Sequence, residues 1–153
     1  MDAQDMGDAL ERILVTEDEL SRRMRELAAQ IDADYQGKEL LLVGVLKGAL
    51  MVMADLSRNL HTPLAMDWMA VSSYGTGTKS SGVVRILKDL DADVHGRDVL
   101  IVEDIIDSGL TLSWLRENLL SRGAASVEIA AALRKPEAAK VHVDVKYVGF
   151  DIP

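Results

Sequence analysis

The residues whose side chains are best suited to binding or catalysis lie together in the sequence VEDIIDSGLT. Two adjacent carboxylates, Glu103 and Asp104, precede a small-residue segment, 107–111, that opens a predicted helix. Such a segment at a helix N-terminus offers free backbone N–H groups and the positive end of the helix dipole, which together can hold a phosphate. The hydroxyls of Ser108 and Thr111 can donate further hydrogen bonds. The stretch therefore predicts a phosphate-binding loop.

A simpler interpretation is that Asp107 or Ser108 only caps the helix. Capping explains either residue alone, but not the two carboxylates that come before them. Because carboxylates repel a phosphate, Glu103 and Asp104 must bind something else, such as sugar hydroxyls or a divalent cation. Mg²⁺ prefers oxygen ligands, often few carboxylates together with phosphate oxygens and water. A ribose phosphate with Mg²⁺ satisfies the whole arrangement.

The elements that would position these residues alternate between short apolar runs and helical patterns. A capping box, Thr16 with Glu19, predicts the start of the first helix. Helices are predicted at about 17–35, 49–60 and 110–121, and strands at 39–46, 64–71, 83–87, 98–102, 127–133 and 145–148. Residues 83–87 could pair with the strand before them as a hairpin. This alternation predicts an α/β fold, an open and mostly parallel sheet flanked by helices.

Ligands of such sheets bind in the crevice outside the carboxyl ends of the strands. Three polar breaks follow predicted strands, at Lys47-Gly48, at Glu103 onward and at Arg134-Lys135. Three segments that are distant in the sequence should therefore meet at one crevice. Residues 72–82, SSYGTGTKSSG, have no apolar periodicity and predict a mobile loop.

Length and composition exclude several classes of protein. The 153 residues suit one domain, 1–153, and the net charge of −8 argues against a nucleic-acid partner. The absence of cysteine excludes a disulfide framework, a thiol nucleophile and any Cys-built metal site. No apolar run approaches the ~18 residues of a membrane span. An acidic N-terminus without an apolar core predicts no signal peptide. We therefore expect a cytoplasmic protein with no membrane partner.

The stretch VEDIIDSGLT resembles the phosphoribosyl pyrophosphate-binding motif of the type I phosphoribosyltransferases. The segments VGVLKGA, VSSYGTGTKSSGVVRILKDLD, LRKP and YVGFDIP resemble the hypoxanthine-guanine phosphoribosyltransferase branch, particularly its bacterial members. The resemblance runs from about residue 13 to residue 153. It implies the type I phosphoribosyltransferase fold and purine salvage. The phosphoribosyl group of 5-phosphoribosyl 1-pyrophosphate would be transferred to hypoxanthine or guanine, giving IMP or GMP and pyrophosphate.

The resemblance also implies roles for individual residues on the sugar side. Glu103 and Asp104 would hold the ribose hydroxyls and act through Mg²⁺, the implied cofactor. Asp107 would be the general base that takes a proton from the purine imidazole. The 5-phosphate would lie on the loop formed by Asp107, Ser108, Gly109, Leu110 and Thr111.

The remaining implied roles concern the purine, the pyrophosphate and a lid. Ile105 would lie against the purine, and Lys135 would donate to its exocyclic oxygen, which selects 6-oxopurines over adenine. Lys47 and Gly48 would bind pyrophosphate, in a loop where this family often has a cis peptide before the lysine. Ser73 and Tyr74, in the predicted mobile loop, would close over the reacting centre.

The resemblance further implies a homodimer or homotetramer. Relatives continue beyond the position of GFDIP with an aromatic segment that stacks on the purine, and this sequence ends at Pro153. We therefore expect a chain that lacks the C-terminal part of the family fold. Such a chain should bind phosphoribosyl pyrophosphate and turn over purines poorly, unless a partner subunit covers the gap.

A second function from a different class stays open at this point. A phosphoribosyltransferase-like fold can serve as a regulatory module that senses ribose phosphates and controls gene expression without catalysis. Asp107 and Lys135 favour the enzyme, and the acidic composition disfavours a nucleic-acid partner. The preference among hypoxanthine, guanine and xanthine is also left open.

Overall fold

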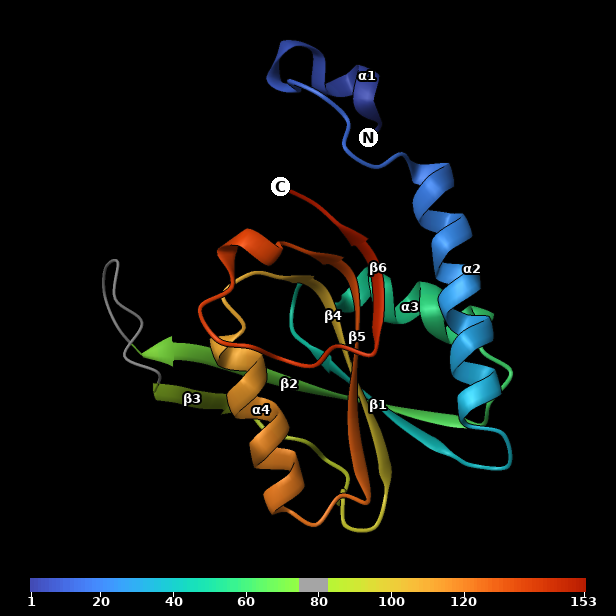
Figure 1. Cartoon of the computed structure of the whole chain (residues 1–153), viewed down its shortest axis with the longest axis vertical. Coiled ribbons are helices and arrows are strands. Elements are labelled where there is room, and N and C mark those ends of the chain that lie inside the picture. Colours follow the sequence, from blue (N-terminus) through green and yellow to red (C-terminus); the bar gives the residue numbers. More distant parts are fainter. Residues whose placement is uncertain (75–82) are drawn as a thin grey trace.

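One six-stranded sheet organises the chain (Figure 1). The computed structural model describes residues 1–74 and 83–153. The strands are β1 (Leu40–Val45), β2 (Leu64–Tyr74), β3 (Val83–Lys88), β4 (Asp98–Ile106), β5 (Ser126–Arg134) and β6 (Tyr147–Asp151). Their order in the sheet is β3-β2-β1-β4-β5-β6, and every neighbouring pair is parallel except β2 with β3. The predicted open, mostly parallel sheet and the hairpin are confirmed.

Helices cover both faces of this sheet. The covering helices are α2 (Glu17–Asp34) and α3 (Leu50–Asn59) on one face and α4 (Leu110–Ser121) on the other. The chain also forms α1 (Ala3–Met6), away from the sheet, and short 3₁₀ turns η1 (Gly7–Ala9) and η2 (Pro136–Ala138). The core of one face joins α2 and α3 to Leu40 and Leu42, while the core of the other joins α4 to Leu41 and Val43. Alternate residues of β1 are therefore buried on opposite faces, as the two-residue period of a strand requires. A strand covered on both faces needs the continuous apolar run seen in the sequence.

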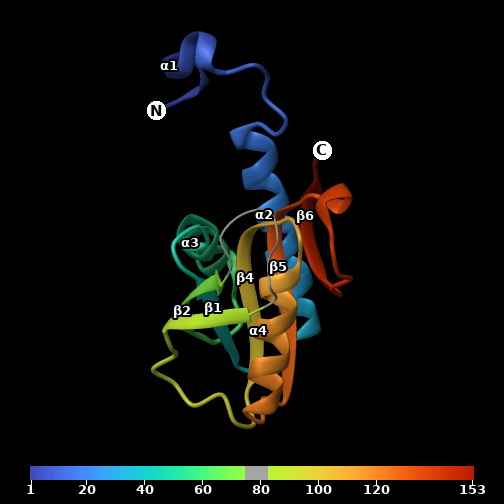
Figure 2. The same cartoon turned by 90° about the vertical axis from the view of Figure 1, so that its left-hand side faces the viewer.

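The helix α2 begins at the predicted capping box. Thr16 Oγ1 accepts a hydrogen bond from the Glu19 backbone N–H at 3.1 Å, and Glu19 Oε1 accepts from the Thr16 backbone N–H at 3.3 Å. The α1 segment that precedes it stands beyond the N-terminal end of α2 (Figure 2). Within the described residues, no helix combines the length and apolar character that crossing a membrane would need.

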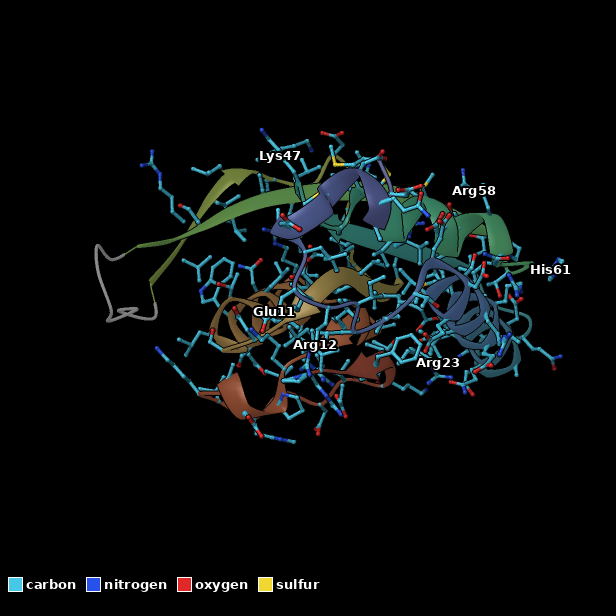
Figure 3. All side chains as sticks on the ribbon, turned by 90° about the horizontal axis from the view of Figure 1, so that it is seen from above. Glu11, Arg12, Arg23, Lys47, Arg58 and His61 are labelled. Carbon is cyan, nitrogen blue, oxygen red and sulfur yellow. The ribbon has the colours of Figure 1, made fainter. Side chains whose placement is uncertain are left out.

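The helix α2 also holds the edge strand β6. Arg23 Nε donates to the backbone oxygen of Gly149 at 3.0 Å, and Arg23 Nη2 donates to that of Val148 at 2.8 Å (Figure 3). Tyr147 donates from its hydroxyl to Asp34 Oδ2 at 2.5 Å. Burial and this bond to a carboxylate raise the pKa of Tyr147 well above its usual value. The last strand is thus fixed to the first long helix by side chains.

Three predicted boundaries were wrong. The strand predicted at 98–102 continues to Ile106, because residues 103–106 keep pairing with β5. The strand predicted at 64–71 continues to Tyr74, so Ser73 and Tyr74 lie in β2 and not in a loop. The other residues of the predicted mobile loop, 75–82, lie outside the described residues. The strand predicted at 145–148 is found at Tyr147–Asp151.

Candidate active site

The candidate site lies where the direction of strand order reverses. From β1 the sheet continues through β2 and β3 on one side and through β4, β5 and β6 on the other. The carboxyl ends of β1 and β4 therefore flank the topological switch point, where open α/β sheets bind ligands. Figure 3 views this edge of the sheet, with Lys47 labelled on the loop after β1. The carboxyl ends of β1, β4 and β5 share this edge of the sheet, so the three distant segments that follow these strands lie at the same edge.

The loop after β1 lies directly against β4. A Cβ added to Gly48 would come 2.5 Å from Asp104 Oδ2, so any side chain at this position would displace that carboxylate. Asp104 Oδ1 accepts a hydrogen bond from the Ile105 backbone N–H at 2.8 Å. The Leu46–Lys47 peptide bond is cis, as the family resemblance implied. Lys47 is exposed at the turn of this loop.

The acidic pair differs from its predicted setting because it lies within β4. Glu103 is mostly buried, and burial raises its pKa to about 8, with the negative charges of Asp104 and Asp107 adding to the effect. In residues 1–74 and 83–153, none of these three carboxylates has an ion-pair partner within 4.0 Å. Among the described residues, the site therefore concentrates negative charge with no cationic side chain within 4.0 Å of these carboxylates.

The predicted phosphate loop is the turn between β4 and α4. Gly109 is the N-cap of α4 and adopts a positive φ of 79°, and no side chain caps the helix. Asp107 Oδ1 accepts from the Ser108 backbone N–H at 2.5 Å, and Ser108 Oγ accepts from the Leu110 backbone N–H at 3.4 Å. The simple interpretation of Asp107 or Ser108 as the N-cap is therefore wrong.

The segment 140–143 contacts this loop from behind, and no pattern in the sequence predicts that contact. The backbone oxygen of Ser108 accepts hydrogen bonds from the backbone N–H groups of Lys140, at 2.9 Å, and Val141, at 3.3 Å. A Cβ added to Gly109 would lie 3.1 Å from Val143 Cγ2 and 3.2 Å from the Val141 backbone oxygen. The segment between η2 and β6 thus fixes the phosphate loop from behind.

Two cavities adjoin this loop, and Asp107 lines both. The first, of about 210 Å³, is also lined by Glu103, Ile105, Ser108 and Thr111. The second, of about 190 Å³, is also lined by Arg134, Lys135 and His142. The exposed carboxylate of Asp107 can therefore face a sugar phosphate on one side and a second reactant on the other.

Lys135 reaches the second cavity from the end of β5. Its backbone N–H donates to the Ile106 oxygen at 2.8 Å, which continues the pairing of β5 with β4 past the last strand residue. Next to it, Arg134 forms an ion pair with Asp151 of β6 that sequence reasoning missed. The pair joins residues on different strands, and neither residue signals the other in the sequence.

Comparison with known families and proteins gives consistent matches. The phosphoribosyl transferase domain matches residues 14–153. The chain is 53% identical over 150 residues to a hypoxanthine-guanine phosphoribosyltransferase of Mycobacterium tuberculosis, covering 94% of this chain and 74% of that protein. The corresponding Bacillus subtilis protein is 50% identical over 144 residues, covering 94% and 80%. The crystal structure of a Staphylococcus aureus hypoxanthine phosphoribosyltransferase superposes with a TM-score of 0.94 at 46% identity, covering 97% of this chain and 81% of that one.

Proposed function

This chain belongs to the phosphoribosyl transferase family, in its hypoxanthine-guanine branch, and from this premise we propose how it salvages purines. It transfers the phosphoribosyl group of 5-phosphoribosyl 1-pyrophosphate to hypoxanthine or guanine and releases pyrophosphate with IMP or GMP. It is thus a pentosyltransferase. The observation that carries the proposal is the position of Asp107, which lines both the cavity of the phosphate loop and the cavity of Lys135.

The phosphate loop binds the 5-phosphate of the sugar. The backbone N–H groups that follow Asp107 stand at the start of α4, where the helix dipole also favours an anion. Gly109 suits this turn because its φ is positive and because a Cβ there would crowd Val143, 3.1 Å away. The hydroxyls of Ser108 and Thr111 line the same cavity. Substrate binding therefore rests on backbone geometry more than on charged side chains.

Enzymes of this branch generally require Mg²⁺, and the acidic pair of β4 fits such an ion. No group of three or more His, Asp or Glu residues within residues 1–74 and 83–153 could hold a metal alone. Glu103 and Asp104 are two neighbouring carboxylates with no ion-pair partner among the described residues, which suits an ion that completes its shell with substrate oxygens and water. There Mg²⁺ would offset the negative charge of the pyrophosphate, including the charge that develops as it leaves, and the ribose hydroxyls would be neutral ligands.

The chemical step exchanges one bond at the anomeric carbon for another. The bond to the pyrophosphate oxygen breaks, and its electron pair leaves with the pyrophosphate. Asp107 accepts the imidazole proton of the purine, and the electron pair of that N–H bond stays on the ring. An imidazole nitrogen then uses an electron pair of the deprotonated ring to form the new bond to the anomeric carbon. General bases of this kind contribute about 10²–10⁴-fold to a rate. Asp107 is exposed and lines both cavities, which supports its access to that proton.

The remaining residues select the base and control the leaving group. Lys135 donates to the exocyclic oxygen of a 6-oxopurine, whereas the amino group of adenine offers it no acceptor. The exposed Lys47, with Gly48, binds pyrophosphate beside Asp104. The family resemblance assigns Ile105 to the purine, although Ile105 lines the cavity of the phosphate loop and not that of Lys135. Ser73 and Tyr74, at the end of β2, are the residues that would close over the reacting centre.

The test is a nucleotide-formation assay with phosphoribosyl pyrophosphate, Mg²⁺ and each purine base in turn. We expect IMP from hypoxanthine or GMP from guanine, no AMP from adenine, and no product after chelation of Mg²⁺. Failure to form nucleotide from any 6-oxopurine would contradict the proposal. Calorimetric binding of phosphoribosyl pyrophosphate is measured in parallel, because it does not depend on the rate at which purines are turned over.

The family membership also supports two proposals about the protein's setting. We propose that the chain works as a homodimer or homotetramer, which light scattering of the full chain tests directly. We further propose that it acts in the cytoplasm, as purine salvage requires. Fractionation of the cells that produce it tests the second proposal.

A further inference from the structure

A charged pair joins the carboxyl ends of β5 and β6, and the mechanism above does not use it. Arg134, the last residue of β5, donates from Nε to Asp151 Oδ1 at 2.7 Å and from Nη2 to Oδ2 at 3.0 Å. Two parallel charge-assisted hydrogen bonds fix the relative orientation of a guanidinium and a carboxylate. The Ile152 backbone N–H adds a hydrogen bond to the Arg134 oxygen at 2.8 Å.

This pair anchors the residue that precedes Lys135. The backbone N–H of Lys135 is held by Ile106 on the β4 side, and Arg134 is held by Asp151 on the β6 side. Directly after Lys135 the chain leaves the sheet at Pro136. The end of β5 is therefore fixed between its two neighbouring strands at the point where the lysine side chain departs.

Stability alone is a weak reason for this arrangement. The side chains of Arg134 and Asp151 are 35% and 50% exposed, and exposed ion pairs add little to the free energy of unfolding. Arg134 also lines the cavity that holds Lys135 and Asp107. Because Asp151 engages both Nε and Nη2, the guanidinium keeps one orientation at the wall of that cavity.

We propose that the Arg134–Asp151 pair is a positioning clasp for Lys135. Resting on the proposed function, the clasp holds the end of β5 where the lysine meets the exocyclic oxygen of the purine. It therefore sets the affinity for a 6-oxopurine nucleotide and leaves the affinity for the sugar phosphate alone. Arg134 and Asp151 act through Lys135 and do not contact the ligand.

The test compares calorimetric binding of IMP and of ribose 5-phosphate to the full chain. Arg134→Gln and Asp151→Asn should each weaken IMP binding by about 10-fold, because small misplacements of a positioned group are costly. Ribose 5-phosphate binding should stay within about twofold, since the phosphate loop is untouched. The exchanged pair, Arg134→Asp with Asp151→Arg, should recover most of the IMP affinity.

Two controls separate positioning from a general structural effect. Arg122→Gln breaks a pair of similar exposure, with Asp89, beyond the C-terminal end of α4, and should change neither affinity. In a Lys135→Gln background, Arg134→Gln should cause no further loss of IMP affinity, because the residue that it positions is gone.

Several results would overturn the clasp. The first is an IMP affinity equal to that of the parent in both Arg134→Gln and Asp151→Asn. The second is an equal loss of affinity for IMP and for ribose 5-phosphate in these variants. The third is that Arg134→Gln lowers the IMP affinity as much in the Lys135→Gln background as in the parent. A parent chain that binds IMP with the expected pattern of variants but forms no nucleotide would contradict the proposed function and support the clasp. A parent chain that binds no IMP would contradict both.

Discussion

Asp107 combines two contacts that make it the residue most directly tied to turnover. Its carboxylate accepts a hydrogen bond from the Ser108 backbone N–H, and the residue lines both cavities. Asp107→Asn keeps an oxygen for the backbone hydrogen bond but removes the proton acceptor. We expect turnover to fall by about 10²–10⁴-fold, while calorimetric affinity for phosphoribosyl pyrophosphate stays within about threefold. Turnover close to that of the parent would remove Asp107 from the role of base.

The acidic pair should make substrate binding depend on the cation. Glu103→Gln with Asp104→Asn removes the ligands proposed for Mg²⁺ and also the charge that repels the substrate. We expect weaker binding of phosphoribosyl pyrophosphate in Mg²⁺ and a flatter dependence of that binding on Mg²⁺ concentration. Calorimetric titrations with and without the ion measure both effects. Identical titrations of variant and parent would assign the pair a structural role.

Glu103 also predicts how stability depends on pH. Its pKa in the folded chain is about 8, above the ordinary 4.5, so folding favours its protonated form. The corresponding stability is fully present below pH 4.5 and is lost as the pH rises through about 8. Without Mg²⁺, Glu103→Gln should therefore raise the free energy of unfolding above that of the parent at pH 8 and above, with little difference near pH 4.5.

Denaturant titrations of the metal-free protein at the two ends of this range measure the effect. Glu117→Gln is a matched control, because Glu117 is exposed on α4, whereas Glu103 is mostly buried beside Asp104 and Asp107. Parent and Glu103→Gln proteins whose stabilities changed in parallel with pH would contradict the assignment.

At the scale of elements, the sequence predicted what depends on near neighbours. The capping box of α2 needs only Thr16 and Glu19, three positions apart, and it was predicted correctly. The end of β4 was not, because charged residues at 103 and 104 look like the end of a buried strand. Pairing with β5 continues through them, and the backbone hydrogen bonds of a strand do not depend on the side chain.

The supports of the site were missed for the same reason. Arg134 with Asp151, and Ser108 with Lys140 and Val141, are contacts between segments that only the folded sheet brings together. No spacing in the sequence indicates either contact. The functional residue types could be predicted from the sequence and the family resemblance, whereas the contacts that hold them in place could not.

The turn between β4 and α4 allows a comparison of two glycines. Gly109 and Gly37 have similar positive φ values, 79° and 74°, but an added Cβ meets Val143 and Val141 at Gly109 and nothing within 4 Å at Gly37. Gly37→Ala should cost only the left-handed backbone penalty, about 1–2 kcal/mol of unfolding free energy. Gly109→Ala should cost more and also weaken binding of phosphoribosyl pyrophosphate.

Thermal denaturation and calorimetry of both alanine variants measure these effects. Gly37→Ala is the control for backbone conformation without crowding. If Gly109→Ala bound the substrate as tightly as Gly37→Ala does, the close packing behind the phosphate loop would have no role in binding.

For the molecule as a whole, the substrate should stabilise the fold that builds its site. A ligand that binds only the folded state at 100 times its dissociation constant adds about 2.7 kcal/mol of stability. For a domain of this size, that corresponds to a rise in Tm of about 5–11 °C. Thermal denaturation with phosphoribosyl pyrophosphate and Mg²⁺ measures the shift, and ribose without phosphate is the control. An unchanged Tm at saturating substrate would contradict a site that exists only in the folded sheet.

The central position of β1 determines when the site at the carboxyl ends of β1 and β4 can form during synthesis of the chain. In the pairing of β1 with β2, Leu40 lies opposite Leu64. In the pairing of β1 with β4, Leu40 lies opposite Asp98, which is much farther along the chain. Closing longer loops costs more entropy, and pairing between distant segments slows folding. A nascent chain can form β1, β2 and β3 early, yet Gly48 meets Asp104 only after β4 has emerged from the ribosome. Substrate in the cell therefore cannot bind during the early steps of folding. It can stabilise only chains in which the centre of the sheet has already formed.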